Sequence, residues 1–192
     1  MLEEEYQARH RPADAQRNLP PLEVPFEFEI REARAEDLPD IREIYNHYVR
    51  NTTVTFDEDA MTLREFRDKL AHLAKLNMPF IVAVSPSGSV LGYAYVQPWK
   101  AKKAYRFTVE NTIYLGPAAT GKGLGNALMA ELIARSKAAG LKEIVAVIAD
   151  RGAEASIHLH EKFGFRDIGH MGRVGFKFDR WLGTVLMQKS LK

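Results

Sequence analysis

Gly121-Lys122-Gly123-Leu124-Gly125-Asn126 is the stretch that decides how this 192-residue chain is organised. It follows an apolar run that ends at Leu115 and precedes a segment with helical spacing, so we expect a strand, a loop and a helix in that order. Glycines let backbone amides approach a ligand without an intervening Cβ, and the start of a helix adds unpaired N–H groups. A plain tight turn is the simpler interpretation, but three alternating glycines exceed what a turn needs and favour phosphate binding.

Two nucleotide-binding patterns do not fit this loop. A P-loop needs Ser or Thr after its Gly-Lys pair to bind Mg²⁺, and the residue after Lys122 is Gly123. A dinucleotide fingerprint needs glycine where Asn126 stands. A nucleotide hydrolase is therefore the least favoured function.

The segments around the loop alternate between strand and helix periodicity. Thr62 and Glu65 form a capping-box pattern, and Asp37 is expected to cap the preceding helix. This order predicts an α+β fold with a mixed, mostly antiparallel twisted sheet flanked by helices on both faces. Strands are expected over residues 26–30, 80–84, 90–96, 107–115, 143–149 and within 166–191, and helices over 38–49, 62–77, 125–139 and 154–163.

The first 25 residues differ from the rest of the chain. Four of its nine prolines, Pro12, Pro20, Pro21 and Pro25, lie there among charged and small polar residues. Such a segment buries too little apolar surface to offset the entropy of ordering it. We therefore predict a flexible arm over residues 1–25 and one domain over 26–192.

The composition excludes several classes of function. The chain is 46% hydrophobic and 27% charged with a net charge of +2, whereas a general nucleic-acid binder needs a strong basic excess. It has no cysteine, which removes disulfides and thiolate metal sites, and its histidines lack the His-Glu-x-x-His spacing, so no metal is expected. No apolar run is long enough to span a membrane, and the N-terminus does not resemble a signal peptide. A cytoplasmic protein without membrane partners is expected.

Lys122-Gly123-Leu124-Gly125 resembles the core of the pyrophosphate-binding motif of the GNAT superfamily of N-acetyltransferases, Q/R-x-x-G-x-G/A. The first motif position here is Thr120 instead of Gln or Arg. The resemblance implies acetyl-CoA as co-substrate, held by the loop from Gly121 to Asn126. It also implies that the backbone of Ile113, Tyr114 and Leu115 pairs with the pantetheine arm.

Further segments resemble one branch of this superfamily, the phosphinothricin or methionine sulfoximine and methionine sulfone acetyltransferases. They are residues 45–48 (Tyr-Asn-His-Tyr), 53–56 (Thr-Val-Thr-Phe), 99–115, 156–165 and 174–181. The resemblance covers about residues 28–191 and implies direct acetyl transfer to the α-amine of a small amino acid or analogue. This branch commonly forms homodimers, and the resemblance implies one here.

Two residues are the catalytic candidates. A lone strand glutamate is most often solvated or paired, but the resemblance assigns Glu110 as the base that deprotonates the substrate ammonium. His160 stands where many superfamily members have a tyrosine that protonates the leaving thiolate, and it could act as acid, as base or structurally. His158 lies two residues earlier, on another side of the helix.

A substrate site is expected around these two residues. The basic cluster before Glu110 supplies Lys100 and Arg106 for the carboxylate and oxygens of an amino-acid analogue. Phe56 is expected to line the substrate pocket. Asn111 and Thr112, which follow Glu110, are expected to line it as well.

The sequence leaves two other functions open. One is acetylation of a protein or peptide amine, and the other is a non-catalytic acyl-CoA-binding module. The branch usually carries Asn before the helix at Ser156, but residues 150–154 read Asp-Arg-Gly-Ala-Glu. A loop carbonyl or Ser156 is expected to replace that cofactor contact.

Overall fold

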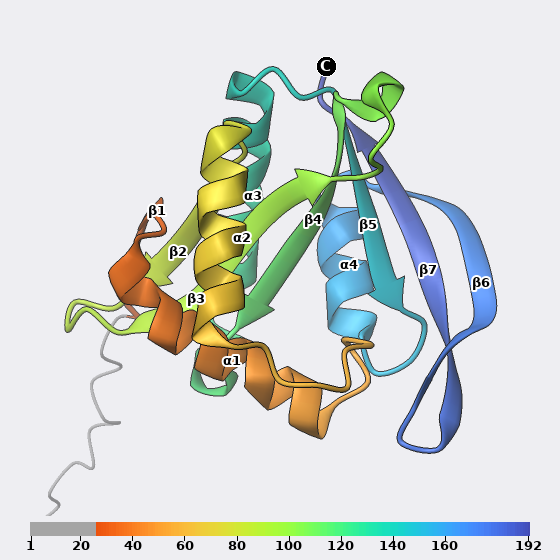
Figure 1. Ribbon diagram of the computed structural model, residues 1–192, viewed down its shortest axis with the longest axis horizontal. Coiled ribbons are helices and arrows are strands. Elements are labelled where there is room, and N and C mark those ends of the chain that lie inside the picture. The colour runs from red at the N-terminus through yellow and green to blue at the C-terminus, as the bar shows by residue number, and fades with distance from the viewer. Residues whose placement is uncertain (1–25) are drawn as a thin grey trace, which may run out of the picture.

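The computed structural model describes residues 26–192, so the predicted arm over 1–25 lies outside the described residues. Seven strands form one sheet in the order β1-β2-β3-β4-β5-β7-β6 (Figure 1). Every neighbouring pair is antiparallel except β4 and β5, which confirms the predicted mixed sheet. The strands are β1 (Glu29–Glu32), β2 (Phe80–Val84), β3 (Val90–Pro98), β4 (Thr108–Leu115), β5 (Glu143–Ala149), β6 (Arg166–Lys177) and β7 (Arg180–Ser190).

Four helices cover both faces of the sheet, as predicted. They are α1 (Leu38–Asn51), α2 (Leu63–Lys75), α3 (Leu124–Ala138) and α4 (Glu154–Lys162). Because side chains alternate along a strand, β2 serves two cores at once. Val82 and Val84 pack with α1 and α2, whereas Ile81 and Ala83 pack with α3. The α1–α2 layer and the α3–α4 layer therefore lie on opposite faces (Figure 1).

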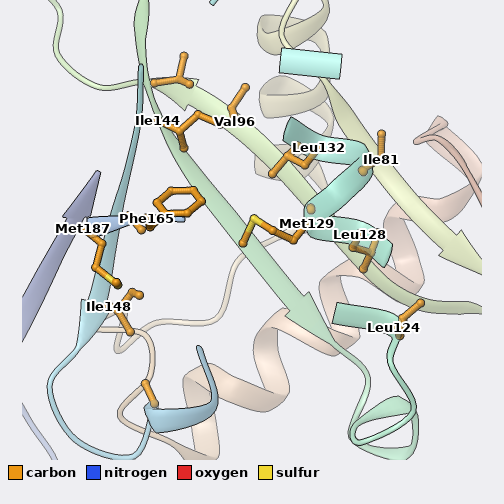
Figure 2. Packing of buried hydrophobic residues seen from close by; sticks show 14 of the residues in the cluster. Ile81, Val96, Leu124, Leu128, Met129, Leu132, Ile144, Ile148, Phe165 and Met187 are labelled. Atoms are coloured by element: carbon orange, nitrogen blue, oxygen red, sulfur yellow. The ribbon is translucent and has the colours of Figure 1, made fainter. Parts of the chain in front are cut away.

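The α3 side holds the larger core. Leu124, Leu128 and Leu132 recur at four-residue spacing on α3 and are fully buried against the sheet (Figure 2). Fully burying one such side chain contributes about 1.5–3 kcal/mol before entropic costs. This packing holds α3 in place against the sheet, and with it the glycine-rich loop, whose last residues form the first turn of α3.

Two local predictions were wrong. The first strand begins at Glu29 instead of Phe26, and as the edge strand it pairs only with β2. Asp37 precedes α1, but its carboxylate accepts both Arg31 guanidinium nitrogens at 2.7 Å and the Arg34 amide instead of capping the helix. A charged partner within reach offers a stronger hydrogen bond than the helix amides do.

The start of α2 follows its prediction closely. The Thr62 hydroxyl accepts from the Glu65 amide, and the Glu65 carboxylate accepts from the Thr62 amide at 2.7 Å. No helix within residues 26–192 is long and apolar enough to cross a membrane.

Candidate active site

The sheet divides between β4 and β5. The two strands pair only at Thr108–Glu143, Val109–Ile144 and Glu110–Val145. Beyond Glu110 they separate, as Figure 1 shows, while β5 stays paired to β7 as far as Ala149. One edge of β4 from Asn111 onward therefore has no strand opposite it among residues 26–192. The Leu115 carbonyl accepts from the Tyr48 hydroxyl at 2.7 Å, and the other backbone groups along this edge can pair with an extended ligand.

A cavity of about 650 Å³ lies at this division. Strand β4 lines it from Glu110 to Leu115, and β5 lines it from Ala146 to Ala149. The α1–α2 loop contributes Val54 to Asp57, and α4 contributes Ala155, Ser156, Leu159 and His160. Thr120 and Gly125 bring the glycine-rich loop to the same cavity. The cavity thus joins both predicted catalytic residues with part of the predicted cofactor residues and part of the predicted substrate residues.

Alternation along β4 sorts the predicted residues between the two faces of the sheet. Tyr114 packs against the rings of Tyr45 and Tyr48 on α1, so Glu110 and Thr112 share the α1–α2 face with it. Asn111 contacts His160 of α4, so Ile113 and Leu115 share the opposite face. Glu110 and His160 therefore reach the cavity from opposite sides of one strand.

Glu110 lies half-buried and opposite Gln97 of β3. Burial raises the pKa of its carboxyl above the ordinary value, and the Gln97 amide and the ammonium groups of Lys69 and Lys100 act against that rise. Lys69 reaches this point from α2, where it donates to the Tyr95 hydroxyl at 3.1 Å and to Gln97 Oε1 at 3.4 Å. A carboxylate with a raised pKa is a stronger base than an exposed one.

His160 is 2% exposed and has a partner at each ring nitrogen. Nδ1 lies 2.7 Å from the Ser156 carbonyl oxygen, and Nε2 lies 2.9 Å from the side-chain amide nitrogen of Asn111. Burial lowers the pKa of His160, and the Ser156 carbonyl acts against that change. His158, by contrast, is 83% exposed and 3.9 Å from Glu161.

The glycine-rich loop takes the backbone conformation that requires glycine. Gly121 and Gly123 have φ of +74° and +80°, and Gly123 immediately precedes α3. A Cβ on either would meet open space, so no neighbouring atoms block the approach to these two residues. Gly125 differs, because its Cβ would lie 3.5 Å from Leu159 in ordinary contact.

The other loop residues contribute less through their side chains than the sequence suggested. The Leu124 side chain is fully buried in the core, so only its backbone faces the loop. Lys122 places its ammonium 4.7 Å from the centre of the Phe26 ring. Asn126 is half-buried in the first turn of α3.

The structure divides the predicted substrate residues between two cavities. Phe56 and Thr112 line the cavity at the β4–β5 division, and Phe56 packs so closely on Gly175 that a Cβ there would lie 2.5 Å from the ring. Lys100 and Arg106 instead line a second cavity of about 930 Å³, together with Trp99, Lys102 and Lys103. Lys69 and Gln97 line both cavities, so they stand at the boundary between the two.

Sequence reasoning missed the anchoring of the α1–α2 loop, residues 52–62. Thr55 is held by the Tyr45 hydroxyl at 3.1 Å and by Lys177, whose buried ammonium donates to the Thr55 carbonyl at 2.9 Å. The Tyr45 hydroxyl also donates to Asp57. At the far end, the Asn46 amide makes two 2.9 Å bonds to the backbone of Met61. The Tyr45-Asn46 pair was visible in the sequence, but its partners lie 10 to 15 residues away.

The segment that lacks the expected Asn has another arrangement. Asp150 accepts from the Gly183 amide at 3.1 Å and lies 3.0 Å from His170 Nε2, so it faces β6 and β7. Gly152, Ala153 and Ser156 line the cavity in its place. His170 lowers the pKa of Asp150, which keeps this carboxylate charged.

Comparisons with known proteins agree with this arrangement. Residues 30–186 match the family model described as the acetyltransferase (GNAT) domain. The chain is 41% identical over 162 residues to a phosphinothricin N-acetyltransferase of Alcaligenes faecalis, covering 84% of this chain and 82% of that protein. It is equally similar, at 41% over 162 residues, to an L-methionine sulfoximine/L-methionine sulfone acetyltransferase of Pseudomonas paraeruginosa, covering 84% and 94%.

A solved structure gives the same result. The phosphinothricin acetyltransferase of Sinorhizobium meliloti in complex with acetyl-CoA superposes with a TM-score of 0.81 and 41% identity, covering 85% of this chain and 88% of that one. The fold, the divided sheet and these similarities agree with the resemblance found in the sequence. The chain belongs to the GNAT family and is an N-acetyltransferase.

Proposed function

We propose that this protein transfers the acetyl group of acetyl-CoA directly to the α-amine of a small amino acid or analogue of the phosphinothricin, methionine sulfoximine or methionine sulfone type. The observation that carries the proposal is the single cavity lined both by Glu110 and by two residues at the glycine-rich loop, Thr120 just before it and Gly125 within it. A reaction between two substrates needs both of them in one such space.

Acetyl-CoA fits the loop and the divided sheet. The open approach to Gly121 and Gly123 and the amides at the start of α3 suit a pyrophosphate. The free edge of β4 from Ile113 to Leu115 suits the amide groups of a pantetheine arm, and a backbone N–H there would polarise the thioester carbonyl. The complex of the Sinorhizobium meliloti relative with acetyl-CoA supports this assignment.

The reaction removes two protons from the substrate nitrogen and returns one to the thiolate. Glu110 takes a proton from the substrate ammonium, directly or through water, and the free amine attacks the thioester carbonyl carbon. The new C–N bond forms, the nitrogen gives up its second proton to the surrounding water, the C–S bond breaks, and the thiolate of CoA leaves and takes up a proton. The raised pKa of Glu110 supports the first step, because it makes this carboxylate more basic.

A small anionic acceptor suits the surroundings of Glu110. Lys69 borders the cavity beside it, and the second cavity beyond carries Lys100, Lys102, Lys103 and Arg106 with Asp68 as its one acidic residue. An amino acid that places its amine near Glu110 would direct its carboxylate towards these cations. The names of the relatives support this substrate class.

The homodimer stays a prediction, and β6 offers a surface for it. β6 is an edge strand of the sheet. β6 and β7 carry exposed apolar side chains at Ile168, Val174, Phe176 and Trp181. The cytoplasmic location likewise stays a prediction from the cysteine-free composition.

The proposed function is tested by release of free thiol from acetyl-CoA. The purified protein is offered methionine sulfone, methionine sulfoximine, phosphinothricin, unmodified amino acids and a peptide with a free N-terminus. We expect release with the small analogues and little with the peptide. Release with the peptide alone would favour a protein N-acetyltransferase, and binding of acetyl-CoA without release would favour a non-catalytic module.

A further inference from the structure

The contact between Asn111 and His160 determines where the histidine carries its hydrogen. The Ser156 carbonyl oxygen can only accept, so the hydrogen at the 2.7 Å contact belongs to Nδ1 of His160. In the neutral ring Nε2 is then an acceptor, and the atom 2.9 Å from it is the NH₂ group of Asn111, a donor. All the hydrogen-bonding positions of the ring are filled in this form.

The Asn111 amide is left half-satisfied by this arrangement. Asn111 is 8% exposed, and its Oδ1 is buried without a hydrogen-bond partner among the described residues. A buried polar oxygen of this kind is costly and calls for an explanation. If the amide turned over by half a rotation, the same oxygen would face Nε2, and it could then accept from a protonated ring.

We propose that Asn111 is a positioning residue that holds His160 as the neutral Nδ1–H imidazole in the free enzyme and turns its amide over when Nε2 gains a proton. In the first state the NH₂ group donates to Nε2, and in the second Oδ1 accepts from Nε2–H. The first state leaves Oδ1 of Asn111 without a partner, and the second leaves its NH₂ group without one. Neither state therefore satisfies the whole amide, and the two can interchange. The amide is nearly symmetric in shape, so the rotation needs no extra volume.

The surroundings favour the neutral state before substrates bind. Within residues 26–192, the ring has two hydrogen-bond partners and one aromatic neighbour: the Asn111 amide from β4, the Ser156 carbonyl of its own helix, and the Phe165 ring, whose centre is 4.8 Å away. None of the three carries a charge, and burial without a counter-charge disfavours imidazolium. His160 therefore has no proton to give at Nε2 in the free enzyme until it has accepted one there.

This inference changes two predictions made from the sequence. Asn111 was placed in the substrate site, but its amide is engaged with His160. The sequence left His160 open as acid, as base or as a structural residue, and in this account it can act as an acid at Nε2 only after it has first received a proton. The tautomer depends on hydrogen bonds within the protein, so it can be tested whichever amine is the acceptor.

Ring ¹⁵N NMR of the full-length protein tests the proposal, because it distinguishes the two neutral tautomers from imidazolium. Signals of His160 are assigned with His160→Gln, and His158 serves as the exposed reference. At neutral pH we expect hydrogen on Nδ1 alone in the wild type. Hydrogen on Nε2 in the neutral ring would overturn the proposal.

Asn111→Leu separates a turning amide from a fixed one. A turning amide supports imidazolium with a charge-assisted bond that leucine cannot make, so the pKa of His160 should fall, by about a tenfold change in the protonation equilibrium. A fixed NH₂ donor would oppose protonation of His160, so its removal would raise the pKa of His160, and that result would overturn the proposal. An unchanged pKa of His160 would also overturn the proposal. Thr112→Val, the next residue on the opposite face, is the matched control and should leave the ring signals unchanged.

Asn111→Asp keeps the shape and serves if the leucine variant does not fold. A carboxylate accepts from Nε2–H and attracts the positive ring, so we expect imidazolium at neutral pH and a pH–rate profile displaced to higher pH. An unchanged His160 pKa in this variant would refute the contact. A raised KM for the amine with unchanged ring signals would return Asn111 to substrate binding and also overturn the proposal.

Discussion

Glu110 and Asn111 are consecutive residues of β4 that serve opposite faces of the sheet. Glu110 faces the α1–α2 layer beside Lys69 and Gln97, while Asn111 contacts His160 of α4. The strand leaves its parallel partner at this point, so both faces open into one cavity. Glu110 and His160, two groups that can move protons, are thereby held on opposite sides of a strand and line the same cavity.

The glycine-rich loop is tested by comparing Gly123→Ala with Gly88→Ala. Gly123 has φ of +80° and Gly88 has φ of +87°, and a Cβ at either position would meet open space. Because alanine is strained at such angles, each variant should lose about 1–2 kcal/mol in the free energy of unfolding. Only the Gly123 variant places a methyl group in the proposed phosphate site. Calorimetric titration should show at least tenfold weaker acetyl-CoA binding for Gly123→Ala alone. Equal affinity of the two variants would remove the loop from the cofactor site.

Lys69 should set the acidic limb of the pH–rate profile. Its ammonium lowers the pKa of Glu110, so Lys69→Met should raise that pKa further. A base is active only when deprotonated, and activity is lost as the pH falls through its pKa. The acidic limb of kcat/KM should therefore move to higher pH in Lys69→Met. The exposed Lys75 on the same helix is the control, and Lys75→Met should leave the profile in place.

Lys177 should hold the cavity wall through Thr55. Lys177 is 1% exposed, and its ammonium donates to the Thr55 carbonyl, next to Phe56. Lys177→Met keeps most of the apolar stem but leaves the Thr55 carbonyl without its donor. We therefore expect the free energy of unfolding to fall by about 1.5–3 kcal/mol. The KM for the amine should rise more than the KM for acetyl-CoA. Denaturant unfolding and steady-state kinetics, with exposed Lys162→Met as control, measure both effects.

Arg106 tests whether the second cavity receives the substrate carboxylate. Arg106→Ala should raise the KM of an amino-acid analogue several-fold and leave the KM of its amide almost unchanged, because only the acid carries the charge. Arg64→Ala, at an exposed position of α2, controls for the loss of a surface charge. If the acid and the amide respond alike, the carboxylate binds elsewhere.

Most of the fold could be predicted because its signals are local. The bounds predicted for β2, β5 and the capping box of α2 agree with the structure, since apolar runs, turn residues and caps act over a few positions. Asp37 failed as a cap because Arg31, six residues earlier, offered its carboxylate a charged partner. The first strand failed because an edge strand depends on its one neighbour for its length.

The site was only partly predictable for the same physical reason. Glu110, His160 and the glycine-rich loop fall within motifs, so their resemblance to a family locates them. The contacts of Asn111 with His160 and of Lys177 with Thr55 join residues 49 and 122 positions apart, and no spacing rule reaches so far. The separation of Lys100 and Arg106 from the first cavity likewise depends on how α2 packs beside β3 and the 99–106 loop.

Glu110→Gln in a pre-steady-state and steady-state comparison with the wild type tests the central claim most directly. Glutamine keeps the shape of the side chain and can still bond to its neighbours, but it is not basic. We expect kcat with methionine sulfone to fall by at least a hundredfold at neutral pH, with acetyl-CoA affinity nearly unchanged. Activity should recover in part at high pH, where free amine is present without a base. A Glu110→Gln enzyme with wild-type kcat and an unchanged pH–rate profile would contradict the account, and the role of base would then pass to His160.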